Sequence, residues 1–203
     1  MTRRLYRQAN GLKILMASDP RMRRIKRDGH EAEIHGHKVW NASFLIMQYL
    51  KRHPLPRGAR VLELGCGWGL LGLYCAKRFG ATVHGIDADA HVLPYLRLHV
   101  EVNGVEMTAE KKRFAQLRGV DLGSWDLILG ADICFWDELA EDLFRLIRRA
   151  KRAGAGRVIL ADPGRPPFAH LADRCLASFD DAQRRWTTAS KPVRTSGELL
   201  IVG

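Results

Sequence analysis

Several features that define other classes of protein are missing from this sequence. Its four cysteines form no C-x-x-C motif, which argues against a zinc site or a disulfide framework and predicts reduced thiols. No apolar run approaches the roughly 20 residues needed to cross a bilayer, and the N-terminus lacks the apolar core of a secretory signal. We therefore expect a cytoplasmic protein that does not contact a membrane. The cysteines are Cys66, Cys75, Cys134 and Cys175.

The sequence has fewer acidic than basic residues. The 203 residues include 22 Asp and Glu against 33 Lys and Arg, which gives a net charge of +11. Much of the excess lies in residues 1–30, where basic side chains accompany only Asp19 and Asp28. This segment is either an arm that touches an acidic partner, such as RNA or an acidic protein face, or a solvated tail. We expect residues 1–37 to form a basic extension and residues 38–203 to form one domain.

Internal repeats and low-complexity blocks are also absent, and the pattern is one of alternating strands and helices. Apolar runs predict strands, and the amphipathic stretches between them predict helices, the first of them capped by Asn41. This alternation, ending in a hairpin, predicts an α/β fold with an open, mainly parallel sheet and one antiparallel strand. The strands are expected near residues 60–64, 81–86, 113–116, 125–131, 157–161, 183–189 and 198–202, and the helices near 42–52, 70–74, 89–102, 137–152 and 168–179.

The most informative stretch joins the first of these strands to its helix. Residues 60–64 read as a strand, and the turn that follows carries Gly65, Gly67 and Gly69 before apolar residues resume at helical spacing. Glycine lets the backbone turn sharply and approach a ligand closely, and the amides at the start of the helix offer hydrogen-bond donors. The segment is a candidate nucleotide-binding corner.

Two carboxylates add to this signal. Glu63 lies two residues before the first glycine, where it could bind a cationic amino group. Asp87 ends the next predicted strand, at a spacing that suits pairing with ribose hydroxyls. Residues 67–72 also fit the G-x-G-x-x-G pattern of nicotinamide dinucleotide sites in a later register, so that reading stays as the alternative.

This acidic-G-x-G-x-G corner, followed by a second acid, resembles the class I S-adenosylmethionine-dependent methyltransferases. The resemblance implies a Rossmann-like, seven-stranded, mainly parallel sheet with helices on both faces and S-adenosylmethionine as the cofactor. The implied cofactor contacts are Trp40, Glu63, Gly65, Cys66, Gly67, Gly69, Asp87, Ala88, Leu117 and Ala131.

A second cluster of polar and aromatic residues follows the strand at residues 125–131. Asp132 lies at the predicted strand end, where ligands bind in open α/β sheets, and Phe135 and Trp136 come just after it. Methylation of a lysine needs a neutral amine, which a dry pocket with a carboxylate and aromatic walls would favour. The alternative is that Asp132 caps the next helix and the rings fill the core.

The element Asp132-x-x-Phe135 is similar to the D-x-x-Y/F element of the seven-β-strand protein lysine methyltransferases. Val39-Trp40 resembles the entry segment of that group, and the run at residues 162–168 is most similar to the electron-transfer-flavoprotein β-subunit lysine methyltransferases. The resemblance implies catalytic roles for Asp132 and Phe135 and a protein substrate, here one with an acidic face. Leu117-Arg118-Gly119 replaces the Trp-Gly pair that this group often carries.

Other acceptors remain open at this point. An RNA methyltransferase could use the basic extension to hold phosphates, and a small-molecule N-methyltransferase could use the same fold. The N/D-P-P-Y/F motif of enzymes that methylate base amines is missing, since Pro166-Pro167-Phe168 follows the wrong strand. The histidine-rich residues 29–37 favour a polar loop over a metal site, and no metal is expected. The sequence leaves the oligomeric state open.

Overall fold

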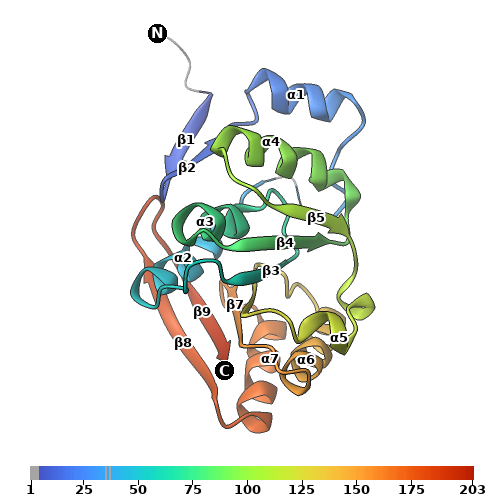
Figure 1. Ribbon diagram of the computed structural model, residues 1–203, viewed down its shortest axis with the longest axis vertical. Helices are drawn as coiled ribbons and strands as arrows, with labels where there is room; N and C mark the ends of the chain where they lie inside the picture. Colours follow the sequence, from blue (N-terminus) through green and yellow to red (C-terminus); the bar gives the residue numbers. More distant parts are fainter. Residues whose placement is uncertain (1–4, 35, 37) are drawn as a thin grey trace.

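The computed structural model describes residues 5–34, 36 and 38–203, and over these residues a seven-stranded sheet separates two layers of helices (Figure 1). Strand β9 runs antiparallel to both of its neighbours, and every other pair in this sheet is parallel. The predicted fold class is confirmed. In spatial order the strands are β5 (Thr108–Lys111), β4 (Thr82–Asp87), β3 (Arg60–Leu64), β6 (Leu127–Ala131), β7 (Arg157–Asp162), β9 (Thr195–Val202) and β8 (Ala182–Ala189).

The central strands bury both of their faces, because alternate side chains point to opposite sides of a sheet. Val61 packs into the cluster on the side of α2 and α3, whereas its neighbour Leu62 packs into the cluster on the side of α6 and α7. This is why the strands read as continuous apolar runs. The first layer consists of α2 (Ser43–Arg52), α3 (Leu70–Phe79) and α4 (Leu93–Asn103), and the second of α5 (Gly119–Leu122), α6 (Asp137–Arg152) and α7 (Pro166–Ser178).

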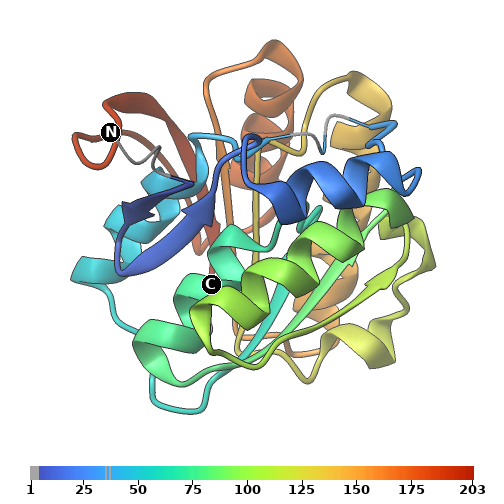
Figure 2. The ribbon, with the colours of Figure 1, turned by 90° about the horizontal axis from the view of Figure 1, so that it is seen from above.

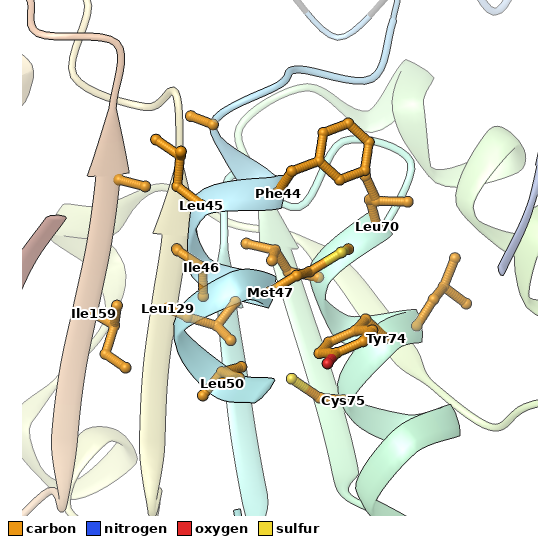
Figure 3. Packing of buried hydrophobic residues seen from close by; sticks show 14 of the residues in the cluster. Phe44, Leu45, Ile46, Met47, Leu50, Leu70, Tyr74, Cys75, Leu129 and Ile159 are labelled. Atoms are coloured by element: carbon orange, nitrogen blue, oxygen red, sulfur yellow. The ribbon is translucent and has the colours of Figure 1, made fainter. Parts of the chain in front are cut away.

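Helix α2 supplies the centre of the first core. Figure 3 shows Ile46 and Leu50 beside Leu129 of β6, and Met47 on the side of Tyr74 of α3. Ile46, Met47 and Leu50 are fully buried. Each large apolar side chain contributes roughly 1.5–3 kcal/mol when buried, so this packing fixes α2 firmly against the sheet. The start of the helix is thereby held at the carboxyl end of the strands, where β6 also ends.

The described part of the basic extension is folded. It forms the hairpin of β1 (Tyr6–Ala9) and β2 (Leu12–Leu15), followed by helix α1 (Pro20–Arg27), which lies beside α4 (Figures 1 and 2). The backbone amide of Leu15 donates to His99 Nε2 of α4 at 3.1 Å. Leu12 is 1% exposed and belongs to the main core. The alternative of a solvated tail is therefore wrong for these residues.

Two local predictions also differ from the structure. The strand expected near residues 113–116 is a short 3₁₀ turn, η2 (Phe114–Gln116), and the edge strand β5 lies earlier in the chain. Because β5 is mostly exposed, it carries no apolar pattern that could reveal it. Asn41 does not cap α2, which begins at Ser43 after Ala42.

Further along the chain, Asp89 was expected to start a helix, and it caps a 3₁₀ turn, η1 (Ala90–Val92), before α4 begins. Pro94 lies in the first turn of α4, a position that proline tolerates. None of the helices in the described part of the chain is long and apolar enough to cross a membrane.

Candidate active site

The glycine turn between β3 and α3 has a left-handed backbone. Gly65, Gly67 and Gly69 have φ angles of 57°, 50° and 75°, values that side chains with a Cβ adopt with strain. A Cβ at Gly65 would also lie 2.5 Å from Ile133, whereas one at Gly67 would meet open space. The turn therefore presents bare backbone toward a ligand at Gly67.

Glu63 and Asp87 are both held by backbone amides at this turn. The Glu63 carboxylate accepts from Gly72 N at 2.9 Å and Leu71 N at 3.2 Å, and Asp87 Oδ2 accepts from Gly67 N at 2.9 Å. Burial raises the pKa of Glu63 to about 8 and also raises the pKa of Asp87, against the effect of these hydrogen bonds. Neither carboxylate has a basic partner within the described residues, so both are available to a cationic or hydroxyl-bearing ligand.

The turn opens into a cavity of about 350 Å³ at the carboxyl ends of the strands. This size suits a small-molecule cofactor. Most residues predicted for the site line this cavity, while Gly69 and Leu117 do not. Leu117 is 4% exposed and packs in the core cluster beside α6, because β5 ends earlier than expected. The predicted residues that line the cavity are Trp40, Glu63, Gly65, Cys66, Gly67, Asp87, Ala88, Ala131, Asp132 and Phe135.

Asp132 leaves the end of β6 in an unusual backbone conformation, with a φ of 58°. Its Oδ2 accepts from Ala42 N at 3.2 Å, and its Oδ1 accepts from Arg165 Nη2 at 2.9 Å. Burial raises the pKa of Asp132, and the hydrogen bond and charge of Arg165 oppose that rise. The prediction that Asp132 caps the following helix is wrong: α6 has no side-chain cap, and the carboxylate meets the start of α2 instead.

Arg165 joins two buried carboxylates. Its Nη1 lies 2.6 Å from Asp162 Oδ2, while Nη2 bonds Asp132. The two oxygens belong to the ends of neighbouring strands β6 and β7, which the fork of a guanidinium can span. The same guanidinium lies 4.6 Å from the centroid of the Phe135 ring. Arg165 therefore fixes both the carboxylate and the aromatic wall of this half of the site.

The aromatic residues border the cavity and do not fill the core, contrary to the alternative considered from the sequence. The Trp40 and Phe135 rings meet edge to face with centroids 5.9 Å apart, and Phe135 lies 5.8 Å from Trp136. Trp136 is 43% exposed. Trp40 and Phe135 can shape an acceptor channel, whereas Trp136 lies at its outer edge.

Several features of the site were not predicted from the sequence. Arg165 does not line the cavity itself, and its pairing with Asp132 was missed because it spans 33 positions and leaves no local pattern. Arg113 and Phe114 line the cavity where Leu117 was expected, and Lys38 lines it from the loop before α2. For Lys38, the sequence indicated a place in the site only through its position directly before Val39-Trp40.

The histidine-rich loop can be described only in part. Over the residues that the structure describes, no cluster of three or more His, Cys, Asp or Glu side chains could hold a metal ion. His35 and His37 lie outside the described residues. The loop is fastened through Asp89, whose Oδ2 accepts from Glu33 N at 2.7 Å.

The fold and this site together define a class I S-adenosylmethionine-dependent methyltransferase. A methyltransferase from Pyrococcus furiosus superposes with a TM-score of 0.61 at 19% identity, covering 90% of this chain and 96% of that one. The magnesium protoporphyrin IX methyltransferase of Synechocystis PCC 6803, solved with bound SAH, gives a TM-score of 0.58 at 20% identity, covering 90% and 92%. At such identities these likenesses show the fold.

The family is set by a closer match. A family model described as lysine methyltransferase matches residues 18–165, and the chain belongs to this family. It is 31% identical over 155 residues to the electron transfer flavoprotein beta subunit lysine methyltransferase of Xenopus laevis, covering 71% of this chain and 61% of that protein. It is 31% identical over 125 residues to the calmodulin-lysine N-methyltransferase of Arabidopsis thaliana, covering 56% and 41%. The chain thus spans less than two thirds of the length of these relatives.

Proposed function

We propose that this protein transfers a methyl group from S-adenosylmethionine to a lysine amine of a protein substrate. The observation that carries the proposal is the arrangement at the end of β6. A buried carboxylate, Asp132, and two aromatic rings, Trp40 and Phe135, border the same cavity as the glycine turn. The family and the protein lysine methyltransferases among its relatives support a lysine acceptor.

The cofactor fits the glycine half of the cavity. Two carboxylates without basic partners among the described residues suit its two polar ends, the half-buried Asp87 the ribose hydroxyls and the buried Glu63 the amino cation. The bare backbone at Gly67 lets the ligand approach the turn closely. Cys66, Ala88 and Ala131 line the walls around it. S-adenosylmethionine supplies a methyl group that its sulfonium already activates.

The acceptor half has to align a neutral amine with that methyl group and let a proton leave. Asp132 can accept a hydrogen bond from the incoming amine and so orient its lone pair. Arg165 holds the Asp132 carboxylate in place and favours its ionised form. Trp40 and Phe135 exclude water from one side, which favours the uncharged amine. We expect the increase in the rate of methyl transfer to come mainly from positioning of the amine.

RNA and small-molecule acceptors are less well supported. Three of the five cations on α1 are paired with neighbouring carboxylates, which leaves Arg23 and Arg27 without an acidic partner among the described residues. All five cations are exposed, but the paired carboxylates reduce the net positive charge that this helix offers to phosphates. Pro166 and Pro167 begin α7 and are not placed to accept from a planar base amine.

The acceptor class can be identified by incubating the purified protein with a lysate and cofactor labelled in its methyl group. One half of the lysate is treated with nuclease first. Label that stays in protein bands, and that mass spectrometry places on lysine, supports the proposal. Label that disappears after nuclease treatment, or that is found in small molecules, contradicts it.

The basic extension gives a separate prediction about the acidic face of the substrate. Deletion would expose the core, because Leu12 and Ile14 of β2 are buried, so charge reversal is the cleaner test. We expect Arg23→Glu combined with Arg27→Glu to weaken binding of an acidic protein substrate and to flatten its salt dependence, with unchanged cofactor affinity.

The matched control for that variant lies at the opposite end of the molecule. Arg148 and Arg152 line a groove of about 650 Å³ near the last turn of α6, whose first turn borders the active site. Since α6 has 16 residues, its ends lie roughly 24 Å apart. Reversing these two charges should leave the salt dependence as it was. If the groove variant has the larger effect, the substrate docks there and not on α1.

A further inference from the structure

Lys38 places an amine of the chain itself at the active-site cavity. Of the lysines that the structure describes, it alone lines this cavity. Its Nζ lies 4.2 Å from the centroid of the Trp40 ring, which in turn contacts the edge of Phe135. The Lys38 ammonium therefore touches the aromatic wall that we assign to an incoming substrate lysine.

The amine is held there by little else. Lys38 is exposed and forms no ion pair with a carboxylate of the described residues. Lys26, Lys112 and Lys151, by contrast, pair with carboxylates at 2.9 Å. A cation over an aromatic ring at an exposed site contributes roughly 0.5–1 kcal/mol, so the side chain can leave the ring and enter the channel.

We propose that the protein methylates its own Lys38 within the same molecule. This inference rests on the proposed lysine methyltransferase activity. In the step, Lys38 Nζ first loses a proton to solvent, and its lone pair then forms a bond to the methyl carbon of S-adenosylmethionine. The bond between that carbon and sulfur breaks, its electron pair stays on sulfur, and S-adenosylhomocysteine leaves.

The product would suit its surroundings better than the starting amine. Methylation keeps the positive charge and replaces N–H groups with methyl groups, and aromatic faces bind methylated ammonium groups well. Methylated Lys38 should therefore stay over Trp40 and narrow the entrance to the channel. The modification would slow the entry of substrate lysines and so limit the activity of each molecule.

The test is to incubate the purified protein alone with S-adenosylmethionine and to map methyl groups by peptide mass spectrometry. We expect methyl groups on Lys38, at a rate per molecule that does not depend on protein concentration, and no label in Lys38→Arg. A second measurement needs no turnover during the assay. An amine-acylating reagent should modify Lys38 in cofactor-free protein. After preincubation with S-adenosylmethionine, the fraction of Lys38 that reacts should fall in proportion to its dimethylation.

The chain supplies its own control. Lys13 Nζ also lies over an aromatic ring, 5.7 Å from the centroid of Tyr6, but it does not line the cavity. Lys13 should stay unmethylated. Absence of methyl groups on Lys38, equal labelling of Lys13, or a rate that rises with protein concentration would overturn the inference. Labelling of other proteins in the lysate decides the proposed function separately, since it does not require Lys38.

Discussion

The two halves of the cavity differ in the groups that pair with their carboxylates. On the cofactor side, Glu63 and Asp87 accept only from backbone amides among the described residues. On the acceptor side, Asp132 and Asp162 share the guanidinium of Arg165. The first pair has no cationic partner in the free protein, and Glu63 there holds a proton below about pH 8, whereas the second pair shares one positive charge that the chain itself supplies.

This difference indicates what each half contributes. Unmatched buried carboxylates are costly, and the cost is offset when a cationic or hydroxyl-bearing ligand binds. The cofactor half therefore gains affinity from electrostatics. The acceptor half has a fixed carboxylate that is already paired with Arg165, so it offers direction and shape to an amine more than attraction. Three predictions follow this division, beginning with the largest effect.

The largest effect is expected at Asp132. Asp132→Asn keeps one oxygen, which can accept from Arg165 or from Ala42 N but not from both, and it weakens the acceptor presented to the amine. We expect methyl transfer to fall by roughly 10²-fold or more, the usual scale for a lost proton acceptor, with cofactor affinity nearly unchanged. Single-turnover rates with a methylatable protein and calorimetric binding of S-adenosylhomocysteine measure the two quantities.

Asp162→Asn is the matched control, because Asp162 pairs with the same arginine and does not line the cavity. Its substitution should lower the melting temperature and leave the rate within a few-fold. Equal losses of rate in both variants would mean that the ion pair acts as a unit and that Asp132 has only a structural role. Turnover of Asp132→Asn within a few-fold of the original rate would have the same meaning.

The next effect is on cofactor affinity. Asp87→Ala should weaken S-adenosylmethionine binding by about 1–3 kcal/mol, the scale of losing hydrogen bonds to a charged group. Asp126→Ala provides the comparison, because Asp126 Oδ2 also accepts a backbone amide, that of Arg60, but at the opposite end of the sheet. Calorimetry should show a loss of affinity in the first variant alone, and unchanged affinity would remove Asp87 from the site.

The last prediction depends on pH and concerns Glu63. Its pKa is raised from 4.5 to about 8 by burial, so between these values the folded protein holds a proton that the unfolded chain has lost. The stability of the free protein should therefore fall as the pH rises through this window and level off above pH 8. Thermal melting across this range measures the slope, which Glu63→Gln should reduce; the raised pKa values of Asp87 and Asp132 leave a remainder of the same sign.

Cofactor binding should show the linked effect. The amino cation pairs with ionised Glu63, so binding below pH 8 releases a proton, and affinity rises by up to about tenfold per pH unit toward that value. Calorimetry in two buffers with different ionisation enthalpies counts the proton. Affinity that is flat with pH, or equal proton release in Glu63→Gln, would place the amino group elsewhere.

The cofactor half was largely predictable from the sequence. Its signals are local: an apolar strand, three glycines that the left-handed turn requires, and an acid at the end of the next strand. The ends of β3, β4 and β6 could be placed because strands buried on both faces are continuous apolar runs. These same elements bring the residues from Glu63 to Asp87 together.

The acceptor half could be predicted only in part, for a physical reason. Asp132 and Phe135 follow a strand that the apolar pattern reveals. Arg165 belongs to another βα loop, and it can pair with both Asp132 and Asp162 only because β6 and β7 are neighbours in the sheet. Leu117 was misplaced because the polar edge strand β5 gives no apolar pattern. The hairpin of β1 and β2 was missed because each strand has only four residues and β1 buries only its last one, which leaves too short an alternating pattern.

The left-handed backbone at Asp132 also restricts how this position can change in evolution. At a φ of 58°, Asp, Asn and Gly are tolerated, and most other residues are strained. Asn and Gly are each one nucleotide away from the codons of Asp. The substitutions that leave the fold intact are therefore the ones that remove the proposed proton acceptor, so this lineage has a short mutational path to folded, cofactor-binding descendants without catalytic activity.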